Sequence, residues 1–149
     1  MIPKIKKILY ATDLSQNSSY VFRYALNSAE VHDAQIDILY VAQSVAGIEL
    51  AASALPDKTG ALEAIKKRLD DFVQTELKDS PDRMNRVSAI QVVEGHPAAE
   101  ILRKADDLKP DVIIMGTHGK GAIAHTFLGS VATSVLQHTR IPVFIVPLP

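Results

Sequence analysis

The sequence contains no cysteine, which excludes disulfide bonds and thiolate metal sites. It also has almost no net charge, because 16 lysine and arginine residues stand against 17 aspartate and glutamate residues. Such a chain offers no electrostatic reason to bind nucleic acid or an anionic membrane, so we expect neither as a partner. The absence of cysteine also fits a cytoplasmic location.

Long hydrophobic runs are missing as well. The basic N-terminal residues are followed by a short apolar run over residues 8–12, too short for a signal peptide core or a membrane span. With 149 residues, 47% of them hydrophobic, the chain is long enough to bury a core of its own. We therefore expect one domain over residues 1–149.

Short apolar runs alternate with amphipathic stretches along most of the chain. The pattern predicts strands over residues 8–12, 36–41, 87–93, 111–115 and 142–146, and helices over 19–29, 62–77, 98–108 and 130–138. Ser15 is expected to cap the first helix, and Pro97 to open the third. The segment Ala42–Gly60 has no sustained period, so we expect a long loop there.

This alternation predicts parallel strands with helices on both faces of the sheet. An open doubly wound sheet binds ligands beyond the carboxyl ends of its strands, where the strand order reverses. Asp13, Val41 and Gly116 stand at such ends, after the first, second and fourth expected strands. We expect these three segments to converge on one crevice.

Glycines are concentrated after the fourth strand, at Gly116, Gly119 and Gly129, and Ser130 follows the last of them. A loop between a strand and a helix with this spacing predicts a phosphate cradle built from backbone N–H groups. The alternative is that the first two glycines make a tight turn and the third allows close helix packing. A Walker A loop is excluded, because no glycine lies at the required distance before Gly119-Lys120.

The stretch Gly116-Thr117-His118-Gly119, then nine residues, then Gly129-Ser130 follows the pattern Gly-x₂-Gly-x₉-Gly-Ser/Thr. In this motif, and along the whole chain, the protein resembles the universal stress protein family in its ATP-binding branch. One departure is Ala11, where many relatives have proline. We expect a single-domain, doubly wound open α/β sheet of five parallel strands with four main helices. The expected strand order is 3-2-1-4-5, as in adenine nucleotide alpha hydrolase-like proteins.

The resemblance implies a site for ATP or another adenine nucleotide, with Mg²⁺ on the phosphates. The implied residues are Ala11, Thr12 and Asp13 in the adenosine pocket, Val41 at the adenine edge, Met115 and Gly116 beside the ribose, and His118, Gly119, Gly129, Ser130 and Val131 at the phosphates. It also implies a homodimer through the last strand, Ile141–Val146.

The residues themselves support these roles less sharply. Asp13 at a strand end can accept from a ribose hydroxyl or bind water on a cation, or it can simply mark a helix entry. Ser130 can bond a phosphate oxygen as well as cap its helix. No histidine pair has a ligand spacing with a matching carboxylate, so we expect no dedicated side-chain metal site.

The motif region contains no evident general base, arginine finger or second carboxylate to orient an attacking water. We therefore expect a nucleotide-dependent regulatory or sensor protein of the stress response. A slow ATPase or phosphotransferase is one alternative, and a docking module that binds no nucleotide is another. The apolar edge strand favours pairing with a second copy, because an open edge of this kind promotes aggregation.

Overall fold

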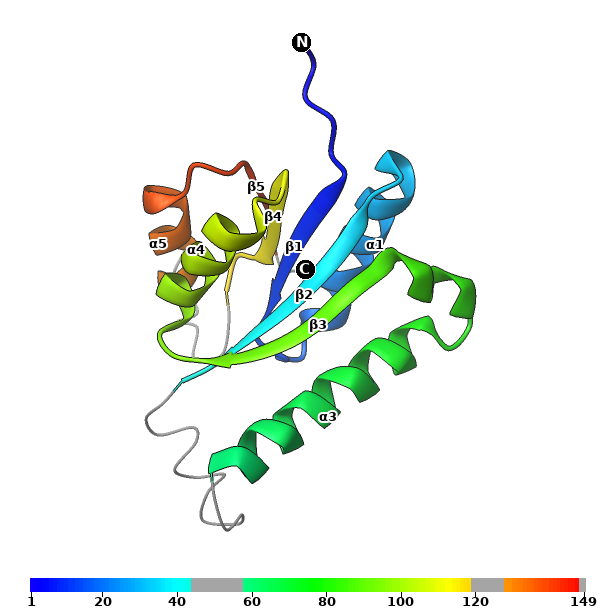
Figure 1. Cartoon of the computed structure of the whole chain (residues 1–149), viewed down its shortest axis with the longest axis vertical. Helices are drawn as coiled ribbons and strands as arrows, with labels where there is room; N and C mark the ends of the chain where they lie inside the picture. The colour runs from blue at the N-terminus through cyan, green and yellow to red at the C-terminus, as the bar shows by residue number, and fades with distance from the viewer. Residues whose placement is uncertain (44–57, 119–127, 148–149) are drawn as a thin grey trace.

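The computed structural model describes residues 1–43, 58–118 and 128–147, with Lys58 and Thr59 described for their backbone alone. It contains one parallel sheet of five strands in the order β3-β2-β1-β4-β5 (Figure 1). The strands are β1 Lys7–Thr12, β2 Gln35–Ala42, β3 Val87–Glu94, β4 Val112–Gly116 and β5 Val143–Val146. The predicted strand order is confirmed.

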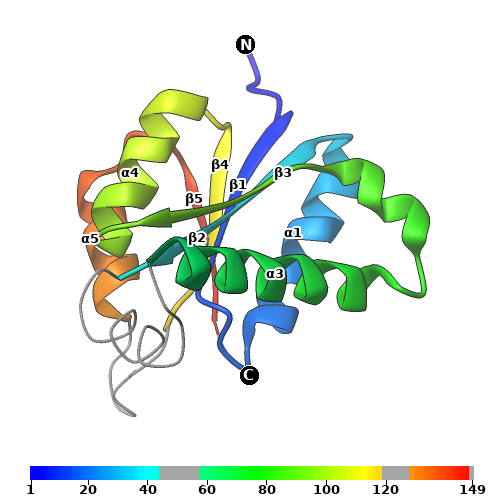
Figure 2. The same ribbon diagram turned by 60° about the horizontal axis from the view of Figure 1, so that its bottom comes forward.

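Helices cover both faces of this sheet. They are α1 Ser18–His32, α3 Lys58–Leu77, α4 Pro97–Leu108 and α5 Ser130–His138. Figure 2 shows α1 and α3 on one side of the strands and α4 and α5 on the other. This is the expected doubly wound arrangement, which parallel strands joined by crossover helices require.

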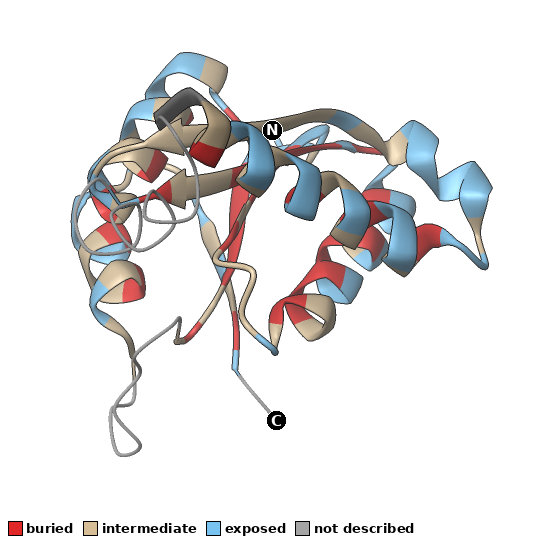
Figure 3. Cartoon of the chain, turned by 90° about the horizontal axis from the view of Figure 1, so that it is seen from below, coloured by how far each residue is buried: buried red, intermediate tan, exposed pale blue. Residues whose placement is uncertain are grey.

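The core lies in two layers, one on each face of the sheet. Alternate residues of a strand point to opposite faces, so Ile8 and Tyr10 pack on the side of α1 and α3, whereas Leu9 packs on the side of α4 and α5. Figure 3 shows the buried positions along the central strands and on parts of the helices. The two layers thus bury both faces of the central strands.

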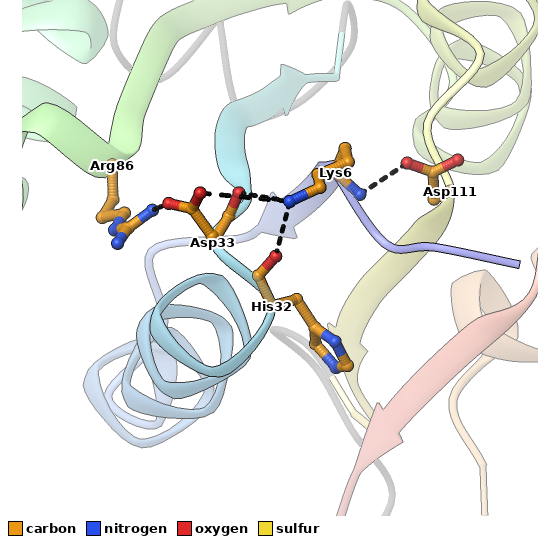
Figure 4. A network of polar contacts seen from close by, with 5 residues as sticks. All are labelled: Lys6, His32, Asp33, Arg86 and Asp111. Atoms are coloured by element: carbon orange, nitrogen blue, oxygen red, sulfur yellow. Dashed lines mark hydrogen bonds and ion pairs between the residues drawn. The ribbon is translucent and has the colours of Figure 1, made fainter.

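The amino-terminal edge of the sheet is tied together by charged residues (Figure 4). The carboxylate of Asp111 accepts the backbone N–H groups of Lys6 at 2.7 Å and Lys7 at 2.9 Å. The Lys6 ammonium donates to the carbonyls of His32 and Asp33, which end α1. The strand β4 begins at Val112, one residue later than predicted, although the Asp111 N–H already donates to the Lys7 carbonyl at 2.8 Å.

The predicted cap at Ser15 is wrong. The helix begins at Ser18, and Asn17 occupies the cap position without a side-chain cap bond. The Ser15 N–H instead donates to Asp13 Oδ1 at 2.9 Å, and the Ser15 carbonyl accepts the N–H of Ser18. The aspartate thus holds Ser15 in a turn and delays the helix. Pro97 opens α4 as predicted.

The predicted loop, Ala42–Gly60, includes residues of β2 at one end and of α3 at the other. Ala42 is the last residue of β2, and α3 begins at Lys58 rather than Leu62. Residues 44–57 lie outside the described residues, as does Gly119 of the glycine motif. A 3₁₀ helix, η1 Pro81–Arg86, lies between α3 and β3, where the sequence analysis predicted no element.

Candidate functional site

The expected site residues come from neighbouring strands at one edge of the sheet. Because all strands run parallel, Thr12, Ala42 and Gly116 end their strands at the same edge, and β1 lies between β2 and β4. In Figure 1 this is the lower end of the sheet. The fold therefore brings the ends of β1, β2 and β4 side by side, as the sequence predicts for a ligand crevice.

Asp13 presents a carboxylate oxygen without a partner at this edge. Its Oδ1 accepts the Ser15 N–H at 2.9 Å and the Ser18 hydroxyl at 3.4 Å. Its Oδ2 is buried and accepts no hydrogen bond within the part of the chain that the structure describes. A buried carboxylate oxygen that is left unpaired costs free energy, so this atom is suited to a donor from outside the chain.

The turn that carries Asp13 is held by hydroxyl groups. The Thr12 hydroxyl donates to Ser18 Oγ at 3.1 Å, and Thr12 Oγ1 accepts the N–H of Leu14 at 3.2 Å. Tyr10 donates its hydroxyl to the Ser18 carbonyl at 3.0 Å, and burial raises the pKa of Tyr10 above its ordinary value. Leu14 takes a left-handed conformation with φ of 56°. Such backbone strain in a bulky residue marks positions that the surrounding structure holds in place.

Val41 lies where the β1–β2 ladder ends. Thr12 pairs with Tyr40 as the last pair of that ladder, whereas Val41 still pairs with Val93 of β3. The N–H of Leu14 would come next along β1, but it turns back to Thr12 Oγ1. The backbone of Val41 is therefore placed at an open edge on the β1 side, where a ligand's hydrogen-bonding edge can meet it.

Beyond β4, Thr117 joins the two described segments that flank residues 119–127. Its N–H donates to the Val146 carbonyl at 3.2 Å, and its own carbonyl accepts the Gly129 N–H at 2.7 Å. Its hydroxyl lies 3.0 Å from Nδ1 of His118. The Gly129 N–H is thereby engaged within the chain, while the backbone of α5 begins directly after it.

The start of α5 carries N–H groups with no side chain to satisfy them. Gly129 occupies the cap position, and no side-chain cap bond is present. The N–H groups of Ser130, Val131 and Ala132 have no intrahelical acceptor at this position in a helix. None of the three bonds another described residue. A helix start of this kind attracts anions.

The remaining expected residues occupy supporting positions. Ala11 and Val41 are half-buried at the ends of their strands, and Met115 is buried in the core layer under α4 and α5. Ser18 and Thr117 were missed as contributors to the site. Ser18 lies in a serine pair after Asp13, and Thr117 occupies a variable position of the motif, so only the contacts of each reveal its part. Among the described residues no three His, Asp or Glu side chains gather into a metal cluster.

Known proteins match this chain along nearly its whole length. The model of the universal stress protein family matches residues 4–147. A universal stress protein of Methanocaldococcus jannaschii is 33% identical over 147 residues, covering 97% of this chain and 83% of its own.

None of the helices in the described part of the chain has the length and apolar character of a membrane span.

Two solved structures show the same fold. The protein MJ0577, also from Methanocaldococcus jannaschii, superposes with a TM-score of 0.77 at 24% identity over 99% of both chains. A universal stress protein solved in complex with cAMP superposes with a TM-score of 0.62 at 21% identity, over 97% of this chain and 98% of its own. The family match, the identity to a curated relative and the shared fold agree. The chain belongs to the universal stress protein family.

Proposed function

We propose that this chain is a cytoplasmic regulatory protein that binds ATP, or another adenine nucleotide, at the carboxyl edge of its sheet. The observation that carries the proposal is the buried Oδ2 of Asp13, which has no partner in the described structure. A ribose hydroxyl, or a water on a phosphate-bound cation, is the kind of donor that would satisfy it. The cysteine-free composition supports the cytoplasmic location.

The phosphates are proposed to meet the start of α5. There the N–H groups of Ser130 and Val131 point out of an uncapped helix end, and the side chain of Ser130 is exposed. Helix starts bind phosphate through such donors and through the helix dipole. Mg²⁺ on the phosphates would neutralise part of their charge, and Asp13 is the acidic residue that we propose to face it.

Adenine and ribose are proposed to lie between the ends of β1, β2 and β4. Val41 offers backbone groups at the open end of the β1–β2 ladder, and Ala11, Thr12, Met115 and Gly116 supply the neighbouring strand ends. The relative solved with cAMP supports this proposal, since cAMP carries an adenine, a ribose and a phosphate. His118, Gly119 and Gly129 are proposed to complete the phosphate side.

Regulation by occupancy is proposed rather than turnover. Asp13 is the one carboxylate that the described residues place at the ends of β1 and β4 or at the start of α5. Hydrolysis needs a group to orient water in addition to a group that meets the cation. We therefore assign nucleotide binding, not phosphate transfer, as the event that the protein reports.

The proposed assembly is a homodimer through Ile141–Val146. The strand β5 lies at the end of the strand order, so one side of it has no partner strand in this chain. Phe144 on β5 and Tyr24 on α1 are 40% and 39% exposed, and their ring centroids are 6.0 Å apart. A second copy would cover both the strand edge and these rings.

Calorimetric titration with ATP, AMP and GTP tests the proposed function. We expect ATP to bind and GTP to bind much more weakly, because the adenine edge is read by backbone groups. Replacing Asp13 by Asn keeps the side-chain shape but removes its charge, and the affinity for ATP should fall roughly tenfold, the value of one hydrogen bond to a charged group. Asp111→Asn, at the opposite edge of the sheet, is the matched control and should bind as the wild type does.

Two outcomes would contradict the proposal. No heat and no bound nucleotide in protein denatured directly after purification would favour a docking module. Phosphate release that is lost in Asp13→Asn while binding persists would favour an enzyme.

A further inference from the structure

Ser18, the first residue of α1, joins that helix to the turn that carries Asp13. The residue is only 4% exposed. Its carbonyl accepts the Tyr10 hydroxyl at 3.0 Å, its Oγ accepts the Thr12 hydroxyl at 3.1 Å, and its own hydroxyl donates to Asp13 Oδ1 at 3.4 Å. The side chain therefore connects the end of β1 to the carboxylate on which the proposed function rests.

The carboxylate of Asp13 determines the direction of these side-chain hydrogen bonds. An ionised carboxylate only accepts, so the single proton of the Ser18 hydroxyl is directed to Asp13 Oδ1. The oxygen of Ser18 keeps its lone pairs for the hydroxyl proton of Thr12. The two hydroxyl groups thus donate in the same direction, and Asp13 is the last acceptor.

The two oxygens of Asp13 are treated unequally. Oδ1 receives both the Ser15 N–H at 2.9 Å and the Ser18 hydroxyl at 3.4 Å, whereas Oδ2 is buried and has no partner within the described chain. One donor alone leaves a carboxylate free to turn about its bond to Cβ. A second donor on another element, here α1, restricts that rotation and keeps Oδ2 directed away from both donors.

We propose that Ser18 is a positioning residue of the nucleotide site, acting on the ligand through Asp13. Its hydroxyl holds the carboxylate so that Oδ2 stays available to a donor from the nucleotide or from its cation. This inference rests on the proposed function and adds the group that orients its acidic residue. The hydroxyl contact is longer than the bond from Ser15, so its removal should weaken nucleotide binding and not abolish it.

A pair of variants separates the action on Asp13 from the support of the helix start. Ser18→Ala removes the hydroxyl and places a good helix former in α1, so the fold should be kept. We expect its dissociation constant for ATP to rise roughly fivefold, the value of one ordinary hydrogen bond. Tyr10→Phe is the matched control, because it removes a hydroxyl that bonds the Ser18 carbonyl and not the carboxylate. It should bind ATP within about twofold of the wild type, since both donors to Asp13 are retained.

A double-mutant cycle with Asp13→Ala tests whether Ser18 acts through the carboxylate. If it does, Ser18→Ala should have no further effect on ATP affinity once Asp13 has been replaced. Three-bond side-chain couplings of Asp13, measured by NMR without nucleotide, provide a second measurement. We expect a single χ1 rotamer in the wild type and in Tyr10→Phe, and a mixture of rotamers in Ser18→Ala.

The outcomes distinguish this inference from the proposed function. A wild-type protein that binds no ATP, or an Asp13→Ala variant that binds it as the wild type does, overturns both. If Asp13→Ala weakens binding and Ser18→Ala does not, the positioning role alone is overturned. Equal losses in Ser18→Ala and Tyr10→Phe, additive effects of the Ser18 and Asp13 substitutions, or one unchanged Asp13 rotamer in Ser18→Ala would also overturn that role alone.

Discussion

Gly129 and His96 both occupy the cap position at the start of a helix, but only His96 caps its helix with a side chain. The imidazole of His96 caps α4 by accepting the Ala99 N–H at 3.4 Å. Gly129 has no side chain, so the start of α5 is left open. Serine, aspartate or asparagine would stabilise such a position in a helix that has no ligand to bind. Under the proposed function, a phosphate of the nucleotide would take the place of the missing cap.

Replacing Gly129 by Asp tests this directly. The backbone there has φ of −69° and ψ of 165°, which any residue adopts, so the fold should be kept. The carboxylate would cap α5 and raise the free energy of unfolding by about 0.5 kcal/mol. It would also accept the N–H groups that are proposed to bind the phosphates, and its charge would repel the ligand. The affinity for ATP should therefore fall more than roughly a hundredfold, which corresponds to the loss of two charge-assisted hydrogen bonds.

Urea unfolding and calorimetric titration measure the two effects of Gly129→Asp. Gly129→Ala is the control, because it leaves the cap empty and should bind ATP with little change. An Asp variant that binds ATP like the wild type would show that the start of α5 does not meet the phosphates.

At the scale of elements, two adjacent lysines at the start of β1 hold the ends of two helices on opposite faces of the sheet. The ammonium of Lys6 donates to the last carbonyls of α1, and that of Lys7 donates to the Leu108 carbonyl of α4 at 3.0 Å. Both interactions place a cation at the negative end of a helix dipole. Asp111 keeps this pair in place by accepting the backbone N–H of Lys6, as Figure 4 shows, and that of Lys7.

Asp111→Ala should therefore destabilise the protein without changing its ligand affinity. Two hydrogen bonds to a charged acceptor are lost, so we expect a decrease of about 2 kcal/mol in the free energy of unfolding. Urea denaturation measures it, with Asp106→Ala on the exposed side of α4 as control. An equal loss in both variants would mean that surface charge, and not the contact with β1, is responsible.

Asp33, at the end of α1, makes the stability of this edge depend on pH. Its hydrogen bond to Arg86, the charge of Arg86 and then that of Lys6 hold the pKa of the Asp33 carboxyl below its ordinary value. A carboxyl whose pKa is lower in the folded than in the unfolded protein stabilises the fold at pH values above its unfolded pKa. That stabilisation is lost as the pH falls through its folded pKa. The difference in unfolding free energy between wild type and Asp33→Asn should thus be present at neutral pH and disappear in acid.

Urea unfolding at a series of pH values checks the sign of this effect. Asp33 is fully exposed, so the difference should be small and should also shrink with added salt. A difference that stays constant down to strongly acidic pH would show that the ion pair with Arg86 contributes nothing.

At the scale of the whole molecule, β5 is the last strand in the sheet order and the strand through which we propose that two copies assemble. The bonds Ile113 N–H to Pro142 and Thr117 N–H to Val146 show that even-numbered residues of β5 face β4. Val143 and Ile145 therefore direct their backbone groups outward. A second copy would pair with these outward groups.

Ile145→Pro removes an outward N–H and leaves the bonds to β4 in place, so it should dissociate the dimer while the monomer stays folded. Phe144→Pro removes an inward N–H and should instead destabilise the fold by about 1 to 3 kcal/mol. Light scattering after size exclusion and thermal unfolding measure the two effects. A wild-type protein that is monomeric at every concentration would rule out this interface.

Local patterns in the sequence determined the order of strands and helices, the parallel sheet and the edge at which Asp13, Val41 and Gly116 meet. These features follow from periodicity, from helix-opening residues such as Pro97 and from strand ends, each of which acts over a few neighbouring residues. For that reason the predicted elements agree with the structure to within a few residues wherever it describes them.

The tertiary structure alone decided which polar groups are taken and which remain open. Asp13 accepts the Ser15 N–H and so holds Ser15 in a turn before the helix that it was predicted to cap, and the Thr117 carbonyl accepts the Gly129 N–H that the motif had offered to a phosphate. Such choices are competitions between groups on different elements, and their outcome depends on distances that exist only after the sheet has formed. The unpartnered oxygen of Asp13 and the backbone hydrogen bonds of Thr117 to Val146 and Gly129 are features of this kind, which only the tertiary structure decides.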